Sequence, residues 1–141
     1  MNFTLMALID VDDPGTLVLP THRLLVNWEQ ETFAAQLSTL ANKLSTYFTI
    51  QTLQDVNTSE DIQSRLLQAG KQGTAFVLKT REQTLLLTLN KQGREHMESS
   101  GHSAAWNILD VAIAQKLLLE DTLGLNAETM AAGTHVRYTH D

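Results

Sequence analysis

The sequence contains no cysteine and only two prolines among its 141 residues. Without cysteine, a disulfide framework, a thiolate zinc site and a cysteine nucleophile are all excluded. No apolar run approaches the roughly 20 residues that cross a bilayer, because Asp10, Pro20 and Lys79 interrupt the longest runs. The N-terminal sequence also lacks the basic region of a secretory signal. From these features we expect a cytoplasmic location.

Positive charge is scarce as well. Ten Lys and Arg residues stand against sixteen Asp and Glu residues, which gives a formal net charge of -6, and the basic residues are scattered. Nucleic acids and acidic membrane surfaces bind concentrated positive charge, so we expect neither as a partner. The sequence also lacks a Gly-rich phosphate loop, a G-x-S-x-G motif and an H-E-x-x-H motif, so no self-contained catalytic set is visible.

What the sequence does contain is typical of a globular protein. Its hydrophobic content is 43% and its charged content 18%, and 141 residues suit one domain. Strand-type and helix-type apolar patterns are interspersed along the chain. We therefore predict a single α+β domain over residues 1–141, with a mixed, largely antiparallel sheet on which the helices pack.

Alternating apolar residues predict the strands, and the clearest hairpin turns at Arg81-Glu82. The predicted strands lie at 3–11, 16–26, 47–53, 74–80, 83–89, 106–108 and 135–139. An Asp-Asp-Pro-Gly turn at 12–15 joins the first two as an antiparallel pair. The polar stretch 90–101 is interpreted as one helical turn and a loop.

Helix capping residues and apolar faces predict the helices. Asn27 caps a helix whose apolar face runs from Phe33 to Leu44, and Asn57 or Thr58 caps a second helix that ends near Gly70. Asp110 is predicted to cap the longest helix, 111–123. A short helix at 127–132 follows it.

Chemistry is most plausible at Thr21, His22 and Arg23, which interrupt an aliphatic strand just after Pro20. Arginine offers a planar fork to phosphate or carboxylate, histidine a switchable proton and threonine a hydroxyl. We interpret the three as candidate ligand-binding residues. The alternative is structural: they would satisfy backbone groups around a bulge at Pro20, with Arg23 paired to a nearby aspartate.

A second polar cluster closes the sequence at 138–141, where His140 and Asp141 form a candidate ligand-binding pair. The alternative is a solvated terminus, because end residues are usually exposed. His96 and His102 have no carboxylate at metal-ligand spacing, so no metal site is predicted. Whether the two polar clusters meet depends on the tertiary fold.

Three segments carry a family resemblance: MALIDVDDPGTLVLPTHRLL near the start, LDVAIAQKLLLEDTLG, and RYTHD at the end. Together they resemble domain-of-unknown-function family 1015, a family of bacterial and archaeal proteins. Its members are longer and carry a DGHHR motif just before the segment where this sequence begins. The resemblance implies that this chain is an internal domain, with the remainder of a longer parent chain as its partner.

The family's DGHHR motif is similar to one in the ParB and sulfiredoxin superfamily, which includes free-serine kinases. The resemblance therefore implies a nucleotide-dependent small-molecule or amino-acid kinase, with nucleotide and magnesium as cofactors of the full-length protein. The isolated chain would be inactive, and Thr21, His22 and Arg23 would form an anion-binding wall. The competing hypothesis is a structural or oligomerisation module, possible as a homodimer through a hairpin edge at 85–89 or the Leu-rich last helix.

Overall fold

The computed structural model describes residues 8, 10, 12–15, 21–26, 30–56 and 58–139. It confirms an α+β fold, in which helices pack on antiparallel sheets. Of the predicted strand at 3–11 only Leu8 and Asp10 are described; neither is in a strand, and Leu8 is exposed. Residues 16–20 of the predicted return strand and the Asn27 cap lie outside the described residues. Among the described helices, none combines the length and the apolar character that a membrane crossing requires.

The strands are short and the helices of unequal length. The strands are β1 (His22–Leu25), β2 (Phe48–Leu53), β3 (Ala75–Lys79), β4 (Thr84–Leu89) and β5 (Val136–Thr139). The helices are α1 (Gln30–Tyr47), α2 (Ser59–Gly70), α3 (Lys91–Glu98), α4 (Ala104–Asn107), α5 (Asp110–Ile113), the π-helix η1 (Ala114–Thr122) and α6 (Ala127–Ala131).

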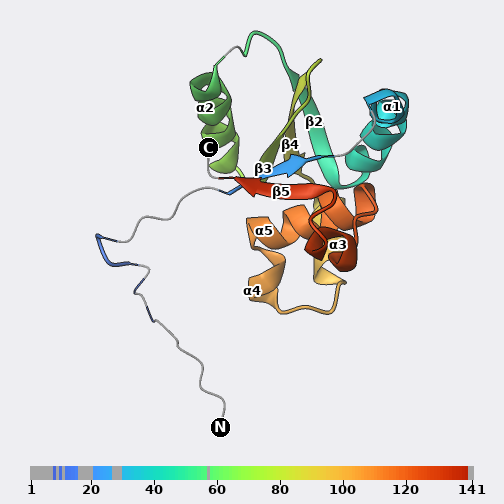
Figure 1. The fold of residues 1–141 in the computed structure, drawn as a ribbon. Helices are drawn as coiled ribbons and strands as arrows, with labels where there is room; N and C mark the ends of the chain where they lie inside the picture. Colours follow the sequence, from blue (N-terminus) through green and yellow to red (C-terminus); the bar gives the residue numbers. More distant parts are fainter. Residues whose placement is uncertain are drawn as a thin grey trace.

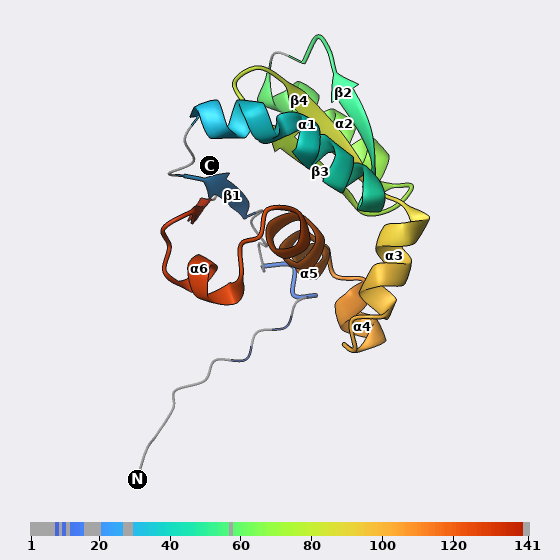
Figure 2. The same cartoon turned by 90° about the vertical axis from the view of Figure 1, so that its right-hand side faces the viewer.

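The larger sheet is antiparallel with strand order β2-β4-β3. The hairpin β3–β4 pairs Lys79 with Thr84, which confirms the predicted turn. Helices α1 and α2 lie on opposite faces of this sheet (Figures 1 and 2). The expected hairpin edge at 85–89 is wrong, because β4 is paired on both sides and its leucines are buried.

The main core lies between this sheet and the helices on its α1 side. Its centre is made by Leu87 and Leu117, both fully buried. The remaining buried members come from α1, β2, β4, α3 and α5: Leu40, Leu44, Phe48, Leu85, Leu89, Met97, Ala112 and Ile113. Burying a side chain of this size stabilises the folded state by about 1.5–3 kcal/mol.

A two-stranded ribbon, β1–β5, lies apart from the larger sheet. We call it the β1–β5 ribbon. Beneath it is a second, smaller core of Leu119, Leu125 and Val136. Since Leu117 belongs to the main core and Leu119 to this one, η1 connects the two. In Figure 2 the α5–η1 segment is seen nearly end-on, beside β1 and below the larger sheet.

Several local signals act as predicted. Thr58 caps α2 in a reciprocal capping box with Asp61. In the turn at 12–15, the Asp13 carboxylate accepts the Gly15 backbone N–H at 2.7 Å. Gly124 ends the long helix with a φ of 72°, a conformation that glycine adopts without steric cost.

Three local predictions are wrong. Residues 91–98 form a two-turn helix rather than one turn, because Asn90 caps it and Met97 anchors it in the main core. The segment predicted as a strand around Trp106 is the helical turn α4, which Ser103 caps. Asp110 is the first residue of α5 and makes no side-chain cap, since the N-cap position is occupied by Leu109.

The described part of the strand predicted at 16–26 has a neighbour that is distant in the sequence. This part, β1, pairs antiparallel with β5. The Val26 N–H donates to the His135 carbonyl at 2.9 Å and extends this pairing by one step. Two segments more than a hundred positions apart are thus joined in one ribbon.

Gly93 provides a test of the packing of α3 against the last residues of α1 and β4. A Cβ at this position would lie 2.5 Å from Leu89 Cδ1 and 2.6 Å from the Tyr47 carbonyl oxygen. We expect Gly93→Ala to lower the free energy of unfolding by about 1–2 kcal/mol, because overpacking outweighs the gain in helix propensity. Urea denaturation measures the change.

The matched control is Gly70→Ala at the end of α2, where a Cβ would meet nothing within 4 Å. This substitution should leave stability unchanged or slightly raised. Equal stability of the Gly93→Ala protein and the unmodified chain would contradict the close approach at Gly93.

Candidate functional site

The two polar clusters predicted from the sequence lie side by side in the β1–β5 ribbon. His22 is paired with Thr139 and Arg23 with Tyr138. Thr21 is exposed immediately before β1. His140 and Asp141 follow β5 in the sequence but lie outside the described residues. The fold therefore joins the described parts of both clusters.

Strand geometry separates His22 from Arg23. Successive side chains of a strand point to opposite faces, and residues directly opposite on paired strands share a face. Arg23 and Tyr138 therefore share the face that continues to buried Val136, whereas His22 shares the other face with Arg137. Adjacent residues in the sequence thus contribute to two surfaces.

Arg23 contacts an aromatic ring and not the aspartate that the structural alternative had predicted for it. Its guanidinium carbon lies 5.6 Å from the centre of the Tyr138 ring, a cation–π arrangement. Its Nε atom is buried and has no hydrogen-bond partner. Among the described residues, no ion pair includes Arg23, His22 or Arg137.

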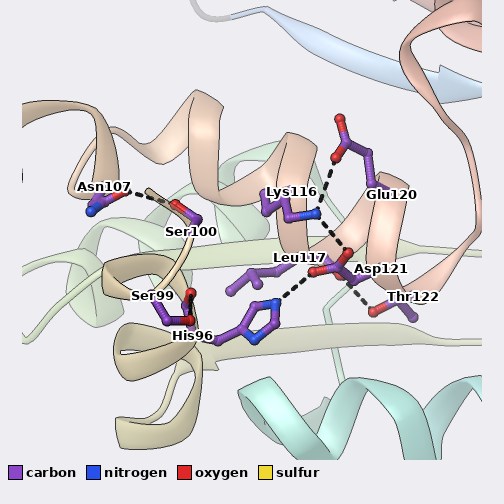
Figure 3. A network of polar contacts seen from close by, with 9 residues as sticks. All are labelled: His96, Ser99, Ser100, Asn107, Lys116, Leu117, Glu120, Asp121 and Thr122. Atoms are coloured by element: carbon purple, nitrogen blue, oxygen red, sulfur yellow. Dashed lines mark hydrogen bonds and ion pairs between the residues drawn. The ribbon is translucent and has the colours of Figure 1, made fainter. Parts of the chain in front are cut away.

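A second site was missed by sequence reasoning. We call it the helical cleft: a hollow of about 560 Å³ between α3, α4 and η1. Figure 3 draws several of its polar lining residues. This volume lies within the range of small-molecule sites. Its lining residues are His96, Ser99, Ser100, His102, Trp106, Gln115, Lys116, Glu120 and Asp121.

Asp121 is the central acceptor of the helical cleft (Figure 3). One carboxylate oxygen lies 2.9 Å from His96 Nε2, and the other accepts a hydrogen bond from Lys116 Nζ at 2.9 Å. Lys116 Nζ also lies 3.4 Å from Glu120 Oε2. A single ammonium group is thus held between two carboxylates.

This arrangement perturbs the lysine. The hydrogen bond to Asp121, with the charges of Asp121 and Glu120, raises the pKa of Lys116 above its ordinary value of 10.5. Partial burial lowers the pKa of Lys116, but this effect is smaller than the combined effect of the two carboxylates. Lys116 therefore remains a cation throughout the physiological pH range.

The π-helix explains why these charges meet. In an α-helix, residues five apart are about 140° apart around the axis. In a π-helix the hydrogen bonds join residues five apart, so their side chains lie on one side. Lys116 and Asp121 are such a pair. Thr122 and Leu117 are also five residues apart, and the Thr122 hydroxyl donates a hydrogen bond to the Leu117 carbonyl at 2.6 Å.

The opposite wall is aromatic. The rings of His102 and Trp106 lie 3.9 Å apart between centroids, with an angle of 36° between their planes. Both histidines were noted in the sequence, but their spatial neighbours could not be predicted. The carboxylate that contacts His96 is 25 positions away along the chain. Among the described residues, no group of three or more His, Asp or Glu side chains could hold a metal ion.

Comparison with known proteins places the chain in a family. The sequence profile of the family described as "Protein of unknown function (DUF1015)" matches residues 1–112. The chain belongs to this family, as the resemblance of its DDPG and LPTHR segments indicated. No curated protein and no solved structure gives a significant match.

The raised pKa of Lys116 makes a prediction about stability and pH. Because the folded-state pKa lies above the unfolded value of about 10.5, the stabilisation is complete below that pH and is lost as the pH rises through the folded value. We expect Lys116→Met to lower the free energy of unfolding by about 1 kcal/mol between pH 7 and 9. Above pH 10.5 the difference from the unmodified chain should shrink.

Urea denaturation at several pH values measures this difference. Lys91→Met is the control, because the Lys91–Glu95 pair is largely exposed, with side-chain exposures of 83% and 60%. Its effect should stay within about 0.5 kcal/mol. A Lys116→Met effect that is equally small at neutral pH would contradict the stabilising role of Lys116.

Proposed function

We propose that this member of the DUF1015 family binds a small anion, a phosphate or a carboxylate, on the β1–β5 ribbon. The observation that carries the proposal is the strand pairing, which brings Arg23, His22 and Arg137 onto two adjacent strands. None of the three pairs with a described acidic side chain. In a chain with a net charge of -6, three basic side chains on one short ribbon are a local concentration.

Arg23 is the residue best prepared for this role. A guanidinium that stacks on an aromatic ring keeps its N–H edge available for a planar, two-point contact with phosphate or carboxylate. Tyr138 supplies the ring. The buried, unpartnered Nε carries an unsatisfied hydrogen-bonding cost of about 1–3 kcal/mol, which a small rearrangement around a bound anion would relieve.

Residues on the two faces of the ribbon have different proposed roles in anion binding. Arg23 belongs to the face with Tyr138, and His22 and Arg137 belong to the other face. We assign the primary anion contact to Arg23, and a secondary, weaker attraction to His22 and Arg137. Thr21 adds an exposed hydroxyl next to β1.

The family resemblance extends the proposal to a nucleotide-dependent, kinase-like protein in which the bound anion is a phosphate group. The unpaired guanidinium groups fit a phosphate. The described residues include no three-ligand cluster that would fit magnesium, so we assign it no step here. In this proposal the ribbon binds and orients the anion, and the catalytic groups come from other residues.

Titration with pyrophosphate, followed by calorimetry and thermal unfolding, tests the anion site. We expect saturable binding to the unmodified chain and a rise in melting temperature, because a ligand that binds only the folded state stabilises it by mass action. Arg23→Ala should weaken the affinity about tenfold or more, as expected for loss of a charge-assisted contact worth roughly 1.5–3 kcal/mol.

Lys91→Ala serves as the charge-matched control, because Lys91 lies in α3, on the far side of the molecule from β1 in Figure 2. Its affinity for pyrophosphate should stay within a factor of about two of the unmodified chain. Unchanged binding to Arg23→Ala, or no binding by the unmodified chain, would overturn the proposal. A mass that rises with concentration in light scattering would then favour the oligomerisation module.

A further inference from the structure

The helical cleft carries a different electrostatic character from the β1–β5 ribbon. Its ionisable lining comprises the carboxylates Glu120 and Asp121, the ammonium of Lys116 and two imidazoles. Two carboxylates therefore stand against one ammonium group. A further cation in the cleft would be attracted by the second carboxylate, whereas an anion would be repelled.

The chain's own lysine shows that a cation is stable in this place. Lys116 Nζ lies 2.9 Å from Asp121 Oδ1 and 3.4 Å from Glu120 Oε2. Glu120 is oriented further by Gln115, whose amide donates to Glu120 Oε1 at 3.3 Å. The two carboxylates are thus held in position by residues of the same π-helix.

The aromatic wall adds a flat surface to the carboxylates. Trp106 is half-buried and His102 is exposed, and their rings lie against each other in a tilted arrangement. Neither ring forms a hydrogen bond within the part of the chain that the structure describes. Aromatic rings of this kind attract organic cations, with tryptophan the strongest of them.

The backbone around the cleft is unusual in the same place. Nine residues form the π-helix, although π-helical segments are mostly single turns and are frequent at functional sites. The i to i+5 spacing brings Lys116 next to Asp121 and Gln115 next to Glu120. A cavity, an excess carboxylate and an aromatic surface therefore coincide at this π-helical segment.

We propose that the helical cleft binds a small planar organic cation, of the amidinium or aromatic ammonium class. The ring of the ligand packs against Trp106 and His102, and its positive group faces Glu120 and Asp121. This site is separate from the anion site and prefers the opposite charge. Neither proposal depends on the other.

Benzamidine is the probe for this test, with benzamide as the neutral analogue of the same shape and benzoate as the anionic one. Two-dimensional NMR follows the indole N–H signals, of which the chain has two because it contains two tryptophans. Trp106→Phe assigns the Trp106 signal. We expect saturable shifts of this signal with benzamidine, and at least tenfold weaker binding of benzamide and benzoate.

Glu120→Gln removes one carboxylate charge and keeps the shape of the side chain. It should weaken benzamidine binding about tenfold, because a charge-assisted hydrogen bond becomes a neutral one. Glu95→Gln is the matched control on the exposed surface of α3, and should bind like the unmodified chain. Thermal unfolding of both variants establishes that they are folded.

Three results would overturn the proposal. Benzoate could bind as tightly as benzamidine, Glu120→Gln could bind benzamidine like the unmodified chain, or benzamidine could leave the Trp106 signal unshifted. Each is distinguishable from failure of the anion site, because pyrophosphate and Arg23→Ala report on the ribbon and benzamidine with Glu120→Gln reports on the cleft.

Discussion

The burial of the α5–η1 segment between two cores is the interaction on which the rest of the described structure depends. Leu117 is fully buried in the core beneath the three-stranded sheet, and Leu119 is buried in the smaller core beneath the β1–β5 ribbon. Only two positions separate them, so one helix must present apolar side chains on two sides. Replacing either by alanine would leave a cavity, at a cost of about 2–5 kcal/mol in comparable cores.

The remaining side of the same helix carries polar and charged side chains. Because the π-helical spacing aligns residues five apart, Lys116 and Asp121 come together on the side that faces α3 and α4. His96 then links α3 to this helix through Asp121. Core packing and cleft formation are therefore consequences of one backbone geometry.

Two surfaces with different ionisable side chains result from this architecture. The β1–β5 ribbon carries Arg23, His22 and Arg137 without acidic partners among the described residues. The helical cleft has more carboxylates than ammonium groups. A chain with an overall charge of -6 thus has three basic side chains together on the ribbon, and more carboxylate than ammonium groups in the cleft.

Features governed by a few neighbouring residues could be predicted from the sequence. They include the start of α2 at Thr58, which was one of two predicted caps, the β3–β4 hairpin, the helical end at Gly124 and the α+β class. Capping, turn formation and alternation all act within a few positions along the chain. The family membership also followed from short segments of sequence.

The helix at 91–98, the π-helix and the helical cleft could not be predicted in this way. A search for a 3.6-residue period assumes α-helical geometry, and the burial of Met97 depends on a core contributed by distant segments. The pairing of Arg23 with Tyr138 and the contact of His96 with Asp121 join residues that are distant in the sequence. The sequence by itself determined the elements that capping residues, turns and alternating apolar residues specify, such as α2 and the β3–β4 hairpin. The tertiary structure alone decided which polar side chains meet, because strand register and helix packing bring together groups that no local pattern connects.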